Sequence, residues 1–199
     1  MSRFPNAQFL ISAASATQFP GDHGAEVAFV GRSNAGKSSA INALAQRQGL
    51  ARTSKTPGRT RLLNFFELAP QRRIIDLPGY GYARASSDEE RRAWRAMTEA
   101  LKDRVCLRGL FVIIDVRRGI TEGDEGLLDW ALPGHRIHVL LSKADKLTRN
   151  EGIRALRDAG AALEGRNAAI QLFSAHSGLG VDAARDTLAA WLEKQPGAQ

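Results

Sequence analysis

The chain has 199 residues, of which 43% are hydrophobic and 25% charged, so it is long enough for one globular domain with a full core. Its single cysteine, Cys106, excludes an intramolecular disulfide, and its apolar runs are too short to span a bilayer. The net charge of +7 is unevenly placed, because residues 47–118 hold 16 basic and 8 acidic groups. We interpret this excess as a face that binds a polyanion, with an arginine-rich solvated surface as the alternative. No signal peptide or membrane anchor is indicated, and we expect a cytoplasmic protein.

Strand and helix patterns alternate along the chain. Residues 1–22 form an extension that either adds a strand near 9–11 or packs on the core. After it we expect a strand at 23–30, a helix at 37–46, a loop at 47–61 and a hairpin of two strands at 62–68 and 72–77. Helices follow at 88–105, 122–131, 148–163 and 181–194, separated by strands at 107–115, 136–142 and 169–174.

This alternation predicts a single three-layer α/β domain over residues 1–199, with its core at about 23–195. The sheet is expected to be mainly parallel with one antiparallel edge strand, and helices are expected on both faces. In such folds ligands bind at the carboxyl ends of the strands, which is where the following motifs lie.

A phosphate-binding motif follows the first core strand. The pattern G-x-x-x-x-G-K-[ST] is satisfied by Gly31, Arg32, Ser33, Asn34, Ala35, Gly36, Lys37 and Ser38. Small residues allow backbone N–H groups to surround phosphates, and the helix N-terminus that follows adds partial positive charge. We expect Lys37 to lie near the β- and γ-phosphates and Ser38 to bind Mg²⁺. The competing interpretation is a glycine-rich turn before a helix, but both the spacing and the context favour the phosphate site.

A second motif ends the strand expected at 72–77. It consists of Asp76, Leu77, Pro78 and Gly79. An acidic residue here can hold Mg²⁺ through water, and the glycine can give its N–H to a γ-phosphate. Aspartate at a strand end is common, so the motif gains its meaning from lying about 40 residues after the phosphate loop.

Two later strand ends could form a site for a guanine base. The first carries Ser142, Lys143, Ala144 and Asp145, and the second carries Phe173, Ser174 and Ala175. The Asp145 carboxylate could accept hydrogen bonds from N1–H and the 2-amino group of guanine, which adenine lacks. The Lys143 stem could cover a base face, and backbone N–H groups at 174–175 could reach the guanine O6. Simple turns after strands are the competing interpretation.

The polar loop at 47–61 contains three threonines, Thr53, Thr56 and Thr60. One of them could reach Mg²⁺ when a γ-phosphate is present and so order the loop. The chemistry of the residues does not choose among the three.

Three long strings of residues make the chain resemble the EngB family. They are 31–39 (GRSNAGKSS), 53–60 (TSKTPGRT) and 76–83 (DLPGYGYA). These are bacterial ribosome-biogenesis GTP-binding proteins of the TrmE–Era–EngA–EngB group, related to septin-like GTPases. The resemblance covers essentially the whole chain and implies a Ras-like P-loop G domain that binds GTP or GDP with Mg²⁺. It also implies binding to the large ribosomal subunit or its precursor, through rRNA and ribosomal proteins, and a link to cell division and septation.

The same resemblance assigns roles to particular residues. It makes Thr60 the switch threonine and a Mg²⁺ ligand beside Ser38, and it makes Lys37, Thr60 and Gly79 the catalytic positions. Further residues expected against the nucleotide are Ser39, Gly58, Arg59, Arg61 and Leu62. One departure is Ser142, where the family usually has threonine, and both residues supply a hydroxyl group.

Two positions bear on the rate of hydrolysis. Tyr80 stands where many GTPases place a glutamine that orients water, so we expect slow hydrolysis that a ribosomal partner accelerates. Asn34 stands where the TrmE group has an asparagine that coordinates K⁺, but an asparagine also suits a tight turn. Both interpretations of Asn34 stay open.

The sequence therefore predicts a slow GTPase switch in ribosome assembly, and we expect a monomer. A module that uses nucleotide only as a structural ligand is a second hypothesis. A P-loop kinase or ATPase is a third. The five basic residues at 47–61 and those after Gly79 would surround both switches, so the nucleotide state could control the affinity for RNA.

Overall fold

The structure is a computed structural model that describes residues 3–52, 62–79, 88–130 and 135–193. Five α-helices in this part of the chain are α1 (Lys37–Ala45), α2 (Asp88–Lys102), α3 (Glu122–Trp130), α4 (Arg149–Ala162) and α5 (Val181–Leu192). The strands are β1 (Gln8–Ala13), β2 (Ala25–Gly31), β3 (Leu63–Ala69), β4 (Arg72–Asp76), β5 (Leu107–Asp115), β6 (Arg136–Ser142) and β7 (Ala168–Leu172). Among the described residues, no helix is both long and apolar enough to cross a bilayer.

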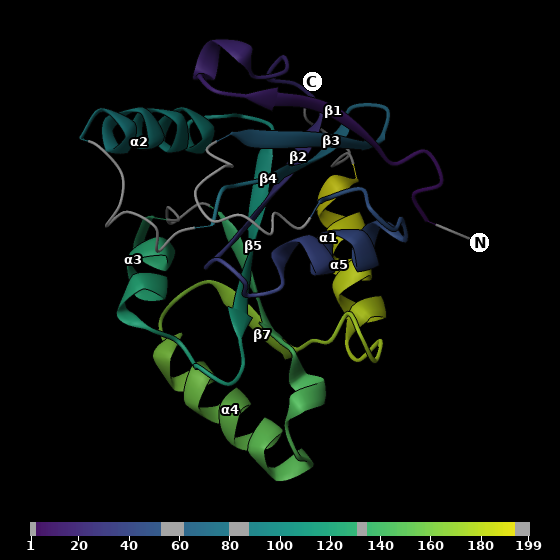
Figure 1. Cartoon of the computed structure of the whole chain (residues 1–199), viewed down its shortest axis with the longest axis vertical. Helices are drawn as coiled ribbons and strands as arrows, with labels where there is room; N and C mark the ends of the chain where they lie inside the picture. Colours follow the sequence, from purple (N-terminus) through teal and green to yellow (C-terminus); the bar gives the residue numbers. More distant parts are fainter. Residues whose placement is uncertain (1–2, 53–61, 80–87, 131–134, 194–199) are drawn as a thin grey trace.

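All of these strands join one sheet in the order β1-β3-β4-β2-β5-β6-β7 (Figure 1). The strands β4, β2, β5, β6 and β7 pair in parallel, whereas β3 pairs antiparallel with both β4 and β1. The expected α/β fold with a mainly parallel sheet is confirmed. The expected antiparallel strand is β3, which lies one place inside the edge because β1 pairs on its outer side. The extension contributes β1, which settles the question that the sequence left open at residues 9–11.

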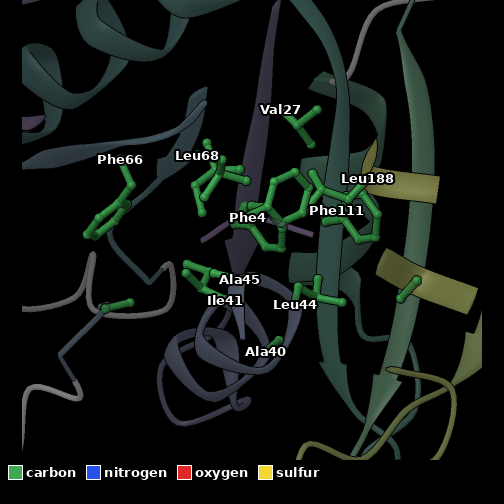
Figure 2. Close-up of a cluster of buried hydrophobic side chains, with 14 of the residues drawn as sticks. Phe4, Val27, Ala40, Ile41, Leu44, Ala45, Phe66, Leu68, Phe111 and Leu188 are labelled. Atoms are coloured by element: carbon green, nitrogen blue, oxygen red, sulfur yellow. The ribbon is translucent and has the colours of Figure 1, made fainter. Parts of the chain in front are cut away.

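Helices cover both faces of the sheet and create two hydrophobic cores. On one face α1 and α5 contribute Ile41, Leu44 and Leu188, which pack with Phe111 of β5 (Figure 2). On the other face α2, α3 and α4 pack against the opposite sides of the same strands. Every residue of β2 is buried, as expected for a central parallel strand that is covered on both sides.

Most expected boundaries agree with the structure within two residues, and the main difference is the end of α2. The helix was expected to reach about residue 105 but ends at Lys102. The carboxylate of Asp22 accepts the backbone N–H groups of Val105 (3.0 Å) and Cys106 (2.9 Å). This contact from the extension draws the chain out of the helix and into β5. By contrast, the start of α4 is set locally by a capping box between Thr148 and Glu151.

A buried histidine, His138, lies in β6 beside the core that α1 and α5 cover. The His138 ring stacks on Phe111, with ring centroids 5.1 Å apart, and its Nε2 lies 2.9 Å from the side-chain oxygen of Gln171. The Gln171 amide nitrogen donates to the carbonyl of Gly180, so its oxygen accepts from His138. Nδ1 of His138 has no hydrogen-bond partner among the described residues. Burial accordingly lowers the pKa of His138, because a charged ring would be desolvated there.

This histidine should make the fold weaker in mild acid. Because the pKa is lower in the folded state than its ordinary value of 6.5, the unfolded chain binds the proton more readily. His138 therefore contributes its full stability above pH 6.5 and loses part of it as the pH falls below that value. Urea unfolding of the wild type and of H138F at pH 7.5 and 5.5 should give a smaller loss in the variant. H176Q, which changes an exposed histidine, should keep the wild-type loss.

Candidate nucleotide-binding site

The predicted motifs meet at one edge of the sheet. The phosphate loop (residues 31–38) follows β2, and residues 76–79 follow or end β4. Residues 142–145 and 173–175 follow β6 and β7 in the same way. Because these four strands run parallel in one sheet, their carboxyl ends lie side by side. The structure thus assembles in space what the sequence shows as four separate segments.

The phosphate loop needs glycine at both ends. A Cβ on Gly31 would lie 2.6 Å from the carbonyl oxygen of Ile113, so no larger residue fits beside β5. Gly36 has a φ of 101°, which favours glycine, and forms the N-cap of α1. Asn34 also adopts a positive φ of 63°, which accounts for an asparagine in this turn. These turns lead directly into the N-terminus of α1, where the sequence predicts that phosphates bind.

The remaining loop positions divide into buried supports and surface groups. Ala35 is buried in the core that α1 and α5 cover. Ser33, Lys37 and Ser38 are half-buried, whereas the side chains of Arg32 and Ser39 are exposed.

Lys37 and Asp76 form an ion pair at the start of α1 and the end of β4. Burial raises the pKa of Asp76, and the positive charge of Lys37 opposes that shift. Next to Lys37, the Ser38 hydroxyl lies 3.4 Å from the carbonyl oxygen of Arg52. Hydroxyl and carboxylate oxygens are hard donors of the kind that Mg²⁺ prefers, so Ser38 and Asp76 fit the expected metal.

The segment after Asp76 lies against the phosphate loop. The backbone N–H of Leu77 donates to the carbonyl of Phe29 in β2 (3.0 Å), and the Leu77 side chain is buried. Pro78 and Gly79 are half-buried. A Cβ on Gly79 would lie 3.0 Å from the backbone nitrogen of Ser33, so a side chain there would push against the loop. This close approach gives the glycine of the second motif a physical reason.

The segment expected to bind the base also contacts the phosphate loop. The Ser142 hydroxyl donates to the carbonyl of Ala35, and the carbonyl of Ile114 lies 3.0 Å from the same oxygen, so serine makes this contact where the family usually has threonine. Lys143 reaches back to the loop, and its Nζ donates to the carbonyl of Asn34 (2.7 Å). The base segment and the phosphate loop are thus joined by two side chains.

Asp145 is held by the segment after β7. Its Oδ1 accepts from the Ser174 hydroxyl (2.6 Å), and this hydrogen bond lowers the pKa of Asp145. The same Ser174 oxygen accepts the backbone N–H groups of His176 and Ser177. Phe173 is buried and its carbonyl accepts from the N–H of Ala144 (3.1 Å), whereas Ala175 is exposed. The weakest of the sequence signals is thus brought into contact with Asp145.

Most of the remaining expected residues belong to two segments, 53–61 and 80–87, that the structure does not describe. Gly58, Arg59, Thr60 and Arg61 lie outside the described residues, as does Tyr80. Leu62 is half-buried immediately before β3. No contact of the described residues chooses among the three threonines of the 47–61 loop.

Comparison with known proteins decides the family. Residues 26–143 match the family described as 50S ribosome-binding GTPase. The whole chain is similar to the probable GTP-binding protein EngB of Coxiella burnetii, with 45% identity over 197 residues that cover 97% of this chain and 96% of that protein. The chain belongs to the EngB family of GTP-binding proteins. As a member of this GTPase family it binds guanine nucleotide and hydrolyses GTP.

Solved structures confirm the fold of this EngB-family GTPase. A crystal structure of a probable EngB protein aligns with a TM-score of 0.63 and 20% identity, covering 84% of this chain and 98% of that one. An Era protein of Aquifex aeolicus bound to GDP and AlF₄⁻ aligns with a TM-score of 0.64 and 21% identity, covering 85% of this chain and 57% of that one. At these identities the likeness shows a shared Ras-like fold.

Sequence reasoning missed one residue of this EngB-family site. Asp115, at the end of β5, was not among the expected site residues. It does accept hydrogen bonds from Arg117, two residues later, but it also accepts one from Lys143. A polar residue at the carboxyl end of a central parallel strand was the available signal.

Proposed function

We propose that this EngB-family GTPase is a slow, nucleotide-controlled switch in assembly of the large (50S) ribosomal subunit, with a link to cell division and septation. The observation that carries the proposal is the match of residues 26–143 to the family described as 50S ribosome-binding GTPase. It acts in the cytoplasm as a monomer with a single EngB-type domain.

The proposed site roles follow the positions of the side chains. Lys37 and the loop that precedes it bind the phosphates, and Asp145 binds the base. Ser38 binds Mg²⁺ with Asp76 behind it, and Thr60 is the second Mg²⁺ ligand by resemblance. When bound with GTP, Mg²⁺ neutralises charge on the β- and γ-phosphate oxygens. The protein itself positions the nucleotide and supplies the positive charge of Lys37.

Hydrolysis by the free protein is slow because Tyr80 cannot orient water as glutamine does. A K⁺ ion beside Asn34 is a further part of the proposal. The positive φ of Asn34 explains the residue without a cation, so the comparison of rates in K⁺ and Na⁺ decides this part. Equal rates remove K⁺ from the mechanism.

A basic surface beside the nucleotide site supports RNA as the partner. Arg47 and Arg52 are exposed after α1, and the carbonyl of Arg52 touches the Ser38 hydroxyl. Arg92 and Arg95 are exposed on α2. Arginine guanidinium groups pair well with phosphate oxygens, and such contacts release counterions from RNA. The contact between Ser38 and the backbone of Arg52 supports an influence of bound nucleotide on part of this surface.

Co-sedimentation with purified 50S subunits tests this function. We expect binding with a GTP analogue to exceed binding with GDP and to weaken steadily as salt rises. Replacing Arg92 and Arg95 together by glutamate should weaken binding about tenfold and reduce the dependence on salt, because each lost phosphate contact lowers the salt slope by about one. Replacing Arg154 and Arg157 of α4 makes the same charge change and should have little effect.

Co-sedimentation, a turnover assay and nucleotide competition together separate the competing functions. Equal binding in all nucleotide states, or no binding to 50S subunits, would contradict the switch. Turnover that 50S subunits do not stimulate would favour a module that uses nucleotide as a structural ligand. Competition by ATP as effective as by GTP would favour a kinase or ATPase.

A further inference from the structure

Asp115 occupies a central place between the two halves of the nucleotide site. It ends β5, the strand that lies between β2, which carries the phosphate loop, and β6, which carries the base segment. In the sheet register Asp115 pairs with Ser142, and Ile113 pairs with Gly31. Only 7% of the Asp115 side chain is exposed. This carboxylate is therefore buried at the end of the strand that separates the two segments.

Two cations hold this carboxylate. Lys143 Nζ donates to Oδ2 at 2.9 Å. Arg117 donates through Nε to Oδ1 (2.9 Å) and through Nη2 to Oδ2 (2.7 Å), and its backbone N–H also donates to Oδ1 (3.2 Å). These hydrogen bonds, from Arg117 first and then from Lys143, lower the pKa of Asp115 below its ordinary value. The group is therefore ionised throughout the physiological range.

Lys143 needs such an anchor. Its ammonium group must reach from the base segment to the Asn34 carbonyl in the phosphate loop, and a third of its side chain is exposed. A lysine stem has four rotatable bonds, and fixing them costs conformational entropy. Lys143 and Asn34 also both adopt positive φ angles, so the backbone on either side is restricted to a less common conformation. An anion at the right distance selects one position of the ammonium group.

We propose that Asp115 is a positioning residue for guanine-nucleotide binding. It holds the Lys143 ammonium on the phosphate loop so that the base segment and the phosphate loop are joined before nucleotide arrives. Arg117 orients the carboxylate from its solvent side. The Lys143 side chain is then already fixed in the free protein, so nucleotide binding does not have to reduce its conformational entropy. Nucleotide is therefore held more tightly and released more slowly. This inference rests on the proposed role of Lys143 and Asp145 in holding the base.

The substitution D115N tests it, because it preserves shape and removes the charge. We expect GDP to bind about tenfold more weakly, the size typical of coupling between contacting side chains. In GTP hydrolysis the variant should have a higher KM. Its kcat at saturating GTP should stay within about twofold of the wild-type value, because Asp115 touches no reacting atom. In the K143A background, D115N should weaken GDP binding no further. Equal effects of D115N with and without Lys143 would show that Asp115 acts on structure alone and overturn the proposal.

A matched control is available at the opposite end of β5. Asp22 is also a carboxylate that accepts backbone N–H groups, those of residues 105 and 106 before the strand begins. D22N should lower the unfolding temperature and leave the Kd for GDP unchanged. If D22N weakens GDP binding as much as D115N does, general loss of stability explains both and the proposal fails.

A second variant covers the case in which D115N does not fold. The Arg117 side chain is 51% exposed, so R117Q removes two hydrogen bonds to the carboxylate with little disturbance. We expect about threefold weaker GDP binding, which disappears in the K143A background. Unchanged GDP binding by R117Q would contradict the proposed role of Asp115 in positioning Lys143. A wild-type protein that does not prefer GDP over ADP would instead refute the base site itself, whatever the Asp115 variants do.

Discussion

Replacing Asp145 by asparagine should change the preferred base from guanine to xanthine. The carboxylate can accept from both N1–H and the 2-amino group of guanine, whereas xanthine carries an oxygen at position 2. An asparagine offers one acceptor for N1–H and one donor for that oxygen. We expect the ratio of GDP to XDP affinity to fall on the order of 10⁴-fold, as for sites built around a buried hydrogen-bonded group. Titration with fluorescent GDP and XDP measures both affinities directly.

The hydrogen bond of Asp145 to Ser174 can be kept in the D145N variant. Its Oδ1 accepts from the Ser174 hydroxyl, and an asparagine oxygen can accept the same hydrogen bond. The fold should therefore tolerate the change. D158N alters an exposed carboxylate on α4 and should leave the preference for GDP intact. A D145N protein that still prefers GDP would show that another group recognises the base.

Much of the fold could be predicted because its signals are local. The strands at 107–115 and 136–142 are mainly apolar, and the structure has them with the same boundaries. Glycines at 31 and 36 and a following helix pattern predicted the phosphate loop and α1. In each case the residues that decide the structure are neighbours in the chain.

What could not be predicted depends on distant partners. The strand β1 carries Phe9, Leu10 and Ile11, which are all substantially exposed, so its residues do not show the alternation of a half-buried strand. It is a strand because it pairs with β3, more than fifty residues later in the sequence. The end of α2 likewise depends on Asp22, which no pattern near residue 102 reveals.

The candidate site divides in the same way. The motif residues could be recognised from their order and spacing in the sequence. Their contacts, however, join segments that are far apart in the chain, such as the hydrogen bond from the Ser142 hydroxyl to the carbonyl of Ala35. The sequence around Asp115 shows only a carboxylate at the end of an apolar strand. Its ion pair with Lys143, 28 residues later, becomes visible only when β5 and β6 lie side by side.

The replacement E26Q should remove about 3–5 kcal/mol from the free energy of unfolding, the usual cost of leaving a buried charge unpaired. Glu26 is fully buried in β2, at the end of the sheet away from the nucleotide site. It accepts from Arg73 (2.7 Å) and from two nitrogens of Arg104 (2.6 and 2.8 Å). Both arginines are nearly buried, so glutamine would leave two positive charges without their anion. Urea unfolding at a fixed GDP concentration measures the loss, because bound nucleotide itself adds stability.

The effect should spread to the segment before β2. Arg73 also donates to the carbonyls of Gly21 and His23, and Arg104 donates to the carbonyl of Pro20. The glutamate orients both arginines, so its loss should loosen residues 20–23 and raise their amide hydrogen exchange. E164Q, at an exposed position, should change stability by less than about 0.5 kcal/mol. A loss below about 1 kcal/mol in E26Q would mean that water or backbone groups replace the carboxylate, and that the network gives no net stabilisation.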